Sequence, residues 1–87
     1  MTTFNQLFET LVERAVSKSV GSRTAELLGL GTHEIGKKIV EEASEVWMAA
    51  EHEDKQATTI EIAQLIYHLQ VLMINKGISL EELEREL

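Results

Sequence analysis

Residues 61–74, EIAQLIYHLQVLMI, decide the fold, because they combine a continuous apolar character with a few regularly spaced polar groups. Glu61, Gln64 and His68 are spaced i, i+3 and i+7, so in a helix they share one stripe. The rest of the circumference is mostly apolar, and a helix that is apolar all round is buried on all sides. A chain of 87 residues offers too little surface to cover such a helix. The stretch therefore predicts a helical homodimer whose core includes it.

Helical periodicity continues through the rest of the chain, which contains no proline. Helices are expected at residues 3–17, 24–28, 33–52, 55–75 and from residue 80 to the end. The two longest are joined by a short connection, so they must lie antiparallel as a hairpin. The sequence thus predicts one all-α domain over residues 1–87, built on a long antiparallel hairpin and completed by dimerisation.

Capping residues mark the expected helix boundaries. Thr32 and Asp54 are candidate N-caps of the two long helices. Gly77 suits the C-terminal end of the second one, because glycine readily adopts the left-handed conformation found there. Ser79 and Glu82 form a capping box for the last helix.

Composition excludes several classes of partner and site. The formal net charge of −7 argues against nucleic-acid binding, which requires a basic face. The chain has no cysteine, and therefore neither a disulfide framework nor a thiolate metal site. No basic start precedes an apolar block, so no secretion signal is expected. No uninterrupted apolar run approaches the roughly 18 residues of a membrane helix. We expect a cytoplasmic protein that binds neither nucleic acid nor membrane.

Acidic residues border the expected core of the helix at residues 33–52. Its apolar stripe is expected to comprise Ile35, Ile39, Ala43, Val46, Trp47 and Ala50. Lys38, Glu42 and Glu45 form a second stripe beside it, and Glu41 lies a little further round. If the hairpin brings Glu61 close to Glu42 and Glu45, the three carboxylates repel one another and resist ionisation. A divalent cation relieves this repulsion, and oxygen ligands on rigid helices are typical of a magnesium site.

Other interpretations of these residues stay open at this point. Glu41, Glu42 and Glu45 could form an ordinary solvated face, stabilised by Lys37 and Lys38 at helical spacing. A buried histidine is more often a hydrogen-bonded core residue than a magnesium ligand, and this applies to His68. Arg23 is either a surface residue or part of an anion site, because the turn at residues 22–24 precedes a helix N-terminus.

Two long segments resemble the phosphoribosyl-ATP pyrophosphohydrolase family, which belongs to the MazG-like all-α pyrophosphatases. They are GKKIVEEASEVWMAAEHE at residues 36–53 and EIAQLIYHLQVLMINKGISLEEL at residues 61–83. GSRTAELL at residues 21–28 is similar to the Ser-x-Thr segment of the family. The resemblance covers nearly the whole chain and implies a MazG-like helical bundle.

The most specific shared feature is a paired acidic motif, ExxE followed after a spacer by ExxD. The ExxE motif falls on Glu42 and Glu45, and Glu41 supplies the doubled acid common in the family. The ExxD motif begins at Glu61 and ends at Gln64, where the family usually has aspartate. The resemblance therefore implies that Glu41, Glu42, Glu45, Glu61 and Gln64 are metal ligands, with one negative charge fewer than usual.

The resemblance also implies a reaction. Phosphoribosyl-ATP would be hydrolysed with Mg²⁺ between its α and β phosphates, giving phosphoribosyl-AMP and pyrophosphate in the second step of histidine biosynthesis. Glu42, Glu45 and Glu61 would be the catalytic acids, and Glu45 is the first choice for the general base.

The remaining matches to the family imply the substrate contacts. Lys37 and Lys38 match its basic pair and would offset the charge of the phosphates. The segment Ser22, Arg23 and Thr24 would bind the phosphoribosyl phosphate or another anionic end of the substrate. Tyr67 and His68 match a Tyr-His pair of the family, to which we assign no role from the sequence.

Two alternatives to the histidine-pathway enzyme remain. The first is a MazG-like pyrophosphohydrolase of other nucleoside triphosphates, which would use the same acidic site. The second is a helical dimerisation module without catalysis, in which the acids are a solvated surface.

Overall fold

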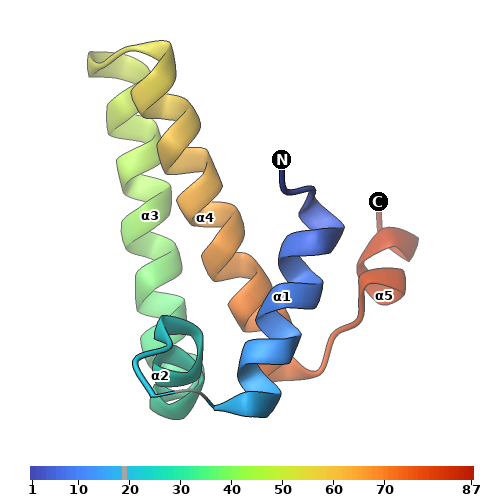
Figure 1. Cartoon of the computed structure of the whole chain (residues 1–87). Coiled ribbons are helices and arrows are strands. Elements are labelled where there is room, and N and C mark those ends of the chain that lie inside the picture. The colour runs from blue at the N-terminus through green and yellow to red at the C-terminus, as the bar shows by residue number, and fades with distance from the viewer. Residues whose placement is uncertain (19) are drawn as a thin grey trace.

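Two long helices, α3 (Thr32–His52) and α4 (Lys55–Lys76), form the antiparallel hairpin that the sequence predicts (Figure 1). The computed structural model describes residues 1–18 and 20–87, and over these ranges the chain contains helices and no strands. The shorter helices are α1 (Phe4–Ser17), α2 (Arg23–Leu30) and α5 (Leu80–Arg85). The all-α class is therefore confirmed.

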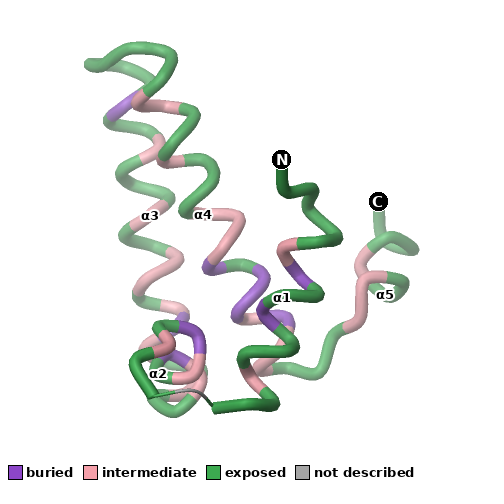
Figure 2. Tube along the Cα trace, in the orientation of Figure 1, coloured by how far each residue is buried: buried purple, intermediate pink, exposed green. Residues whose placement is uncertain are grey.

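The hydrophobic core lies at one end of the hairpin, where α1 and α2 pack against it. Its buried residues are Leu11, Leu27, Ile35 and Val71, one from each of the first four helices. The opposite end of the hairpin, around the α3–α4 connection, projects beyond α1 and is largely exposed (Figure 2). The hairpin thus has a packed half and a half whose outer faces have no partner within the chain.

The seam between α3 and α4 follows a heptad-like spacing along α3. Ile35 and Ala49 are buried, and Ile39, Glu42 and Val46 between them are half-buried. These positions are spaced i, i+4, i+7, i+11 and i+14, which keeps them on one face of a helix. Glu42 therefore lies in the seam itself, among apolar neighbours.

Half of the expected apolar stripe of α3 is wrong, because Ile35, Ile39 and Val46 lie in the seam but the other three residues do not. Trp47 is 65% exposed, and Ala43 and Ala50 are also exposed. These three positions lie one residue beyond the seam, so the 100° turn per residue carries them onto the neighbouring face. Within one chain that face has no covering element.

The α4 helix is covered less completely than its composition predicts. Ile60, Ile62 and Leu69 are 52%, 44% and 42% exposed, because α1, α2 and α3 cover only part of the circumference. By length and mean hydropathy α4 could also cross a membrane, so the expectation that no segment reaches this threshold is wrong. The mean hydropathy of a long window can stay high although the window contains polar residues such as Glu61 and His68, whereas these residues interrupt a continuous apolar run. The core helices of soluble proteins pass the same test.

Most of the predicted caps are present. The Asp54 carboxylate accepts a hydrogen bond from the Ala57 backbone amide at 2.8 Å, and Ser79 and Glu82 form the expected capping box. Gly77 ends α4 in the left-handed conformation, with φ 68°.

The prediction for Thr32 is wrong, because Gly31 is the N-cap of α3 and Thr32 is its first residue. The Thr32 hydroxyl instead donates a hydrogen bond to Oδ1 of Asn75 at 2.7 Å. It thereby ties the start of α3 to the end of α4. The second helix also begins earlier than predicted, since Ser22 is its N-cap and Arg23 its first residue.

Candidate metal centre and active site

Three carboxylates converge across the hairpin. Glu42 and Glu45 lie one turn apart on α3, and Glu61 faces them from α4. One oxygen atom from each side chain lies within 4.8 Å of the corresponding atoms of the other two. We call these three residues the acidic cluster.

The acidic cluster is electrostatically unsatisfied. Oε2 of Glu42 is buried and has no hydrogen-bond partner among the residues that the structure describes. Burial raises the pKa of Glu42, the neighbouring carboxyl groups of Glu45 and Glu61 raise it further, and the charge of Arg23 opposes the shift. The pKa of Glu61 is also raised, first by desolvation and then by Glu45 and Glu53. Hard oxygen donors crowded in this way fit a divalent cation such as Mg²⁺, which compensates both the burial and the repulsion.

These pKa shifts predict how stability depends on pH when a chelator keeps the site free of metal. Above the ordinary glutamate value of 4.5, the unfolded chain releases protons that the folded cluster retains. The folded state then binds more protons, so the free energy of unfolding falls as pH rises through the raised pKa values. Melting curves in EDTA should show this decline, and Glu61→Gln should reduce its slope. An unchanged slope would contradict the assignment of the shifts to the cluster.

The other residues that the sequence predicts to bind the metal or the phosphates are not among the three residues of the acidic cluster. Glu41 is exposed and forms an ion pair with Lys38 at 3.2 Å. Lys37 pairs with Glu34 at 3.6 Å, one turn earlier on α3. Gln64 has an exposed side chain, and its backbone carbonyl lies 2.7 Å from Nδ1 of His68.

The first turn of α2 reaches the hairpin close to the acidic cluster. Ser22 accepts a hydrogen bond from the Ala25 amide at 3.3 Å and so caps the helix. Thr24 is buried, with its hydroxyl 2.8 Å from that of Tyr67. Nη2 of Arg23 lies 3.5 Å from Nε2 of His68, and the charge of Arg23 acts on the Glu42 carboxylate. Of the predicted substrate-binding segment, Arg23 therefore approaches the acids most directly.

Sequence reasoning missed the contact between Arg23 and His68. The spacing of Glu61 and His68 on one stripe was an available signal, because it places the histidine on the same side of α4 as the cluster. Nothing in the sequence identified which residue of the distant α2 segment would meet that histidine. Glu53, whose charge raises the pKa of Glu61, was also missed, since it lies just beyond the end of α3.

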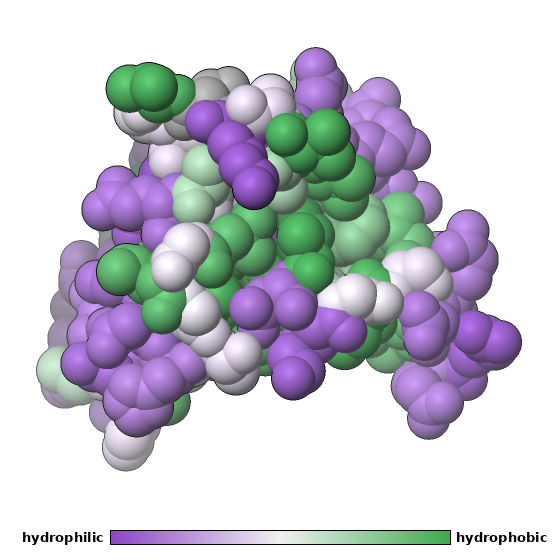
Figure 3. Space-filling model, turned by 90° about the horizontal axis from the view of Figure 1, so that it is seen from below, coloured by the Kyte–Doolittle hydropathy of each residue, from purple (hydrophilic) through white to green (hydrophobic). Residues whose placement is uncertain are grey.

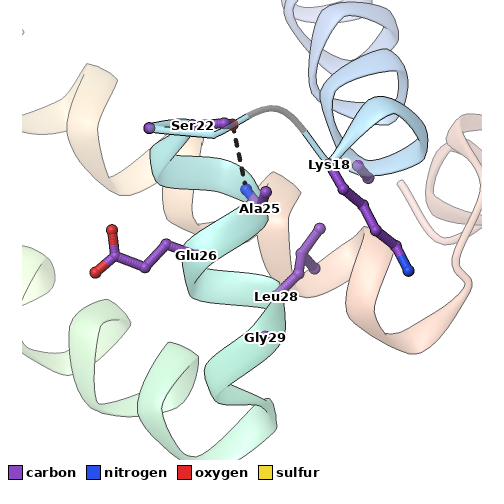
Figure 4. Close-up of a pocket in the computed structure, with 8 residues that line it drawn as sticks. Lys18, Ser22, Ala25, Glu26, Leu28 and Gly29 are labelled. Carbon is purple, nitrogen blue, oxygen red and sulfur yellow. Dashed lines mark hydrogen bonds between the residues drawn. The ribbon is translucent and has the colours of Figure 1, made fainter.

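A cavity of about 630 Å³ lies between the end of α1 and α2 (Figure 4). Ser22, Ala25 and Leu28 line it, together with Lys18. Glu26 also contributes to its lining, but its carboxylate extends to the opposite side of α2 from Leu28 (Figure 4). None of the three clustered carboxylates borders this cavity.

Comparison with known proteins agrees with this geometry. The family model described as phosphoribosyl-ATP pyrophosphohydrolase matches residues 2–87. A phosphoribosyl-ATP pyrophosphatase of Bifidobacterium adolescentis is 55% identical over 87 residues, which cover the whole of both chains. The protein of that name from Streptomyces avermitilis is 57% identical over 81 residues, covering 92% of this chain and 90% of its own. On the strength of a match along nearly its whole length, this chain belongs to the phosphoribosyl-ATP pyrophosphohydrolase family.

Proposed function

We propose that this protein hydrolyses phosphoribosyl-ATP to phosphoribosyl-AMP and pyrophosphate, the second step of histidine biosynthesis. The observation that carries the proposal is the convergence of Glu42, Glu45 and Glu61 within 4.8 Å on two rigid helices. Membership of the family and the names of its close relatives supply the substrate.

We further propose that Mg²⁺ is the cofactor and that the acidic cluster holds it. Oε2 of Glu42 supports this assignment, because this buried carboxylate oxygen has no hydrogen-bond partner among the described residues and is free to coordinate a cation. Gln64 is a candidate additional ligand through its amide oxygen, and Glu41 could join only by leaving Lys38. A bound Mg²⁺ would neutralise charge on phosphate oxygens and lower the pKa of a nearby water molecule.

In this mechanism the side chains position the substrate and move one proton. Glu45 is the exposed member of the acidic cluster, and we assign it the role of accepting a proton from the attacking water. The water oxygen bonds to one of the two bridged phosphorus atoms, whose bond to the bridging oxygen breaks. The bridging oxygen stays with the other phosphate group. Lys37, Lys38 and Arg23 offset the negative charge of the phosphates, which phosphoryl transfer requires more than covalent help.

The active form is proposed to be a homodimer in the cytoplasm, with neither nucleic acid nor a membrane as partner. Ile62, Ile66, Leu69 and Met73 form a stripe at i, i+4, i+7 and i+11 on α4, in which Ile62 and Leu69 are exposed, Ile66 is half-buried and Met73 is buried. Apolar side chains also gather at the end of the molecule where α2 lies (Figure 3). Covering the α4 stripe with a second copy removes apolar surface from water. The net charge of −7 disfavours a nucleic acid.

Turnover assays with phosphoribosyl-ATP and with a panel of deoxynucleoside triphosphates, each with Mg²⁺ and with EDTA, test this function. We expect Mg²⁺-dependent pyrophosphate release, with the highest kcat/KM for phosphoribosyl-ATP. A higher kcat/KM for a deoxynucleoside triphosphate would instead identify a pyrophosphohydrolase of other specificity. Absence of turnover with every substrate would favour the dimerisation module.

A further inference from the structure

His68 is fully buried, and both nitrogens of its ring have partners. Nδ1 lies 2.7 Å from the Gln64 backbone carbonyl, which can only accept, so Nδ1 carries the proton and donates it. Nε2 lies 3.5 Å from Nη2 of Arg23, and a guanidinium group can only donate, so Nε2 is the acceptor in this contact. The two contacts together favour the Nδ1–H tautomer of His68.

A neighbouring contact fixes the position of α2 against this histidine. The ring of Tyr67 packs edge-on against that of His68, with centroids 5.0 Å apart and planes at 90°. The Tyr67 hydroxyl lies 2.8 Å from that of the buried Thr24. Consecutive residues of α4 therefore contact consecutive residues of α2, and the first turn of α2 has a defined place on the hairpin.

Arg23 connects this buried contact to the acidic cluster. Its side chain is exposed, and it meets His68 on the same stripe of α4 that carries Glu61, two turns earlier. A guanidinium group has five N–H donors, and the contact with His68 uses only one nitrogen. The others can donate to a phosphate that lies on the carboxylate side of Arg23.

We propose that His68 is a positioning residue, which holds Arg23 beside the acidic cluster so that the guanidinium binds the pyrophosphate portion of the substrate. This inference rests on the proposed function and narrows it, since the segment around Arg23 was expected to bind the phosphoribosyl phosphate or another anionic end. An arginine already ordered by a buried acceptor loses less side-chain freedom when a phosphate binds.

Calorimetric titration with inorganic pyrophosphate and Mg²⁺ tests the proposal without relying on turnover. Arg23→Met and His68→Asn should each raise the Kd by about tenfold, as expected for loss of a hydrogen-bonded charge. The asparagine amide can still donate a hydrogen bond to the Gln64 carbonyl, but it is too short to place an acceptor at the position of Nε2, which Arg23 contacts. His68→Gln extends an amide oxygen towards that position and should restore the Kd to within about threefold of wild type. In the Arg23→Met background, His68→Asn should have no further effect.

A matched control separates positioning from simple packing of α2. Tyr67→Phe removes the hydrogen bond to Thr24 but keeps the ring that packs against His68, so it should lower the melting temperature and raise the Kd for pyrophosphate much less than His68→Asn does. An increase in the Kd with Tyr67→Phe equal to that with His68→Asn would overturn the proposal. Weaker binding of ribose 5-phosphate by Arg23→Met, with unchanged binding of pyrophosphate, would overturn it as well.

NMR of the wild-type protein provides a test that does not depend on any variant folding. Long-range proton–nitrogen correlations should identify His68 as the Nδ1–H tautomer, and an Nε2–H tautomer would overturn the proposal. If the wild type did not hydrolyse phosphoribosyl-ATP, the proposed function would fail. Even then, the tautomer of His68 and the Kd for pyrophosphate would still test whether His68 positions Arg23.

Discussion

Replacing Glu61 by glutamine is expected to reduce kcat/KM for phosphoribosyl-ATP by about 10³-fold, the scale of losing several kcal/mol of metal-dependent stabilisation of the transition state. Glu61 is the only member of the acidic cluster that α4 contributes, so its charge completes the site across the seam. Glutamine keeps the size of the side chain and removes the charge. The folded protein should tolerate the change, because it relieves repulsion from Glu45.

Thermal melts with and without Mg²⁺ separate loss of the site from loss of the fold. In EDTA, Glu61→Gln should melt at the same temperature as the wild type or higher, while the stabilisation by Mg²⁺ should largely disappear. The control is Glu51→Gln, which removes one negative charge from an exposed residue of α3 outside the acidic cluster. Full activity of Glu61→Gln, or an equal loss in Glu51→Gln, would contradict the proposed metal site.

Leu69→Asp is expected to convert the proposed dimer to a monomer. Leu69 lies on the α4 stripe with Ile62 and is 42% exposed in the single chain. In a symmetric dimer the substitution occurs on both copies, so two carboxylates would enter an apolar contact. If burying each carboxylate costs about 3 kcal/mol, the Kd of the dimer would rise by more than four orders of magnitude. Light scattering after size-exclusion chromatography measures the mass directly.

Val16→Asp is the matched control for this experiment. Val16 is 80% exposed on α1, so the substitution also adds a charge to an exposed apolar position, but one that lies outside the α4 stripe. We expect its mass to equal that of the wild type. A monomeric wild type, or dissociation by Val16→Asp and not by Leu69→Asp, would contradict the proposed interface.

The sequence predicts the relative positions of those site residues that lie on the same helix. The spacing of Glu42 and Glu45 places both acids on the same side of α3 whatever surrounds the helix. The sequence alone does not predict that Glu61 lies close to these two acids, because the rotation of α4 relative to α3 depends on how both helices pack. That rotation also leaves Glu41 outside the acidic cluster, whereas its ion pair with Lys38 follows from their i, i+3 spacing on α3.

The sequence by itself determined the all-α class, the hairpin and most of the helix ends, because periodicity and caps act within a few residues. The resemblance of two long segments and of the paired acidic motif to a known family also pointed to the family. The tertiary structure alone decided that Glu42 lies in the seam and that Thr32 contacts Asn75. It alone joined Arg23 to His68, 45 positions apart in the chain. Such contacts depend on how several helices bury their apolar faces together, and the pattern of one segment does not specify that arrangement.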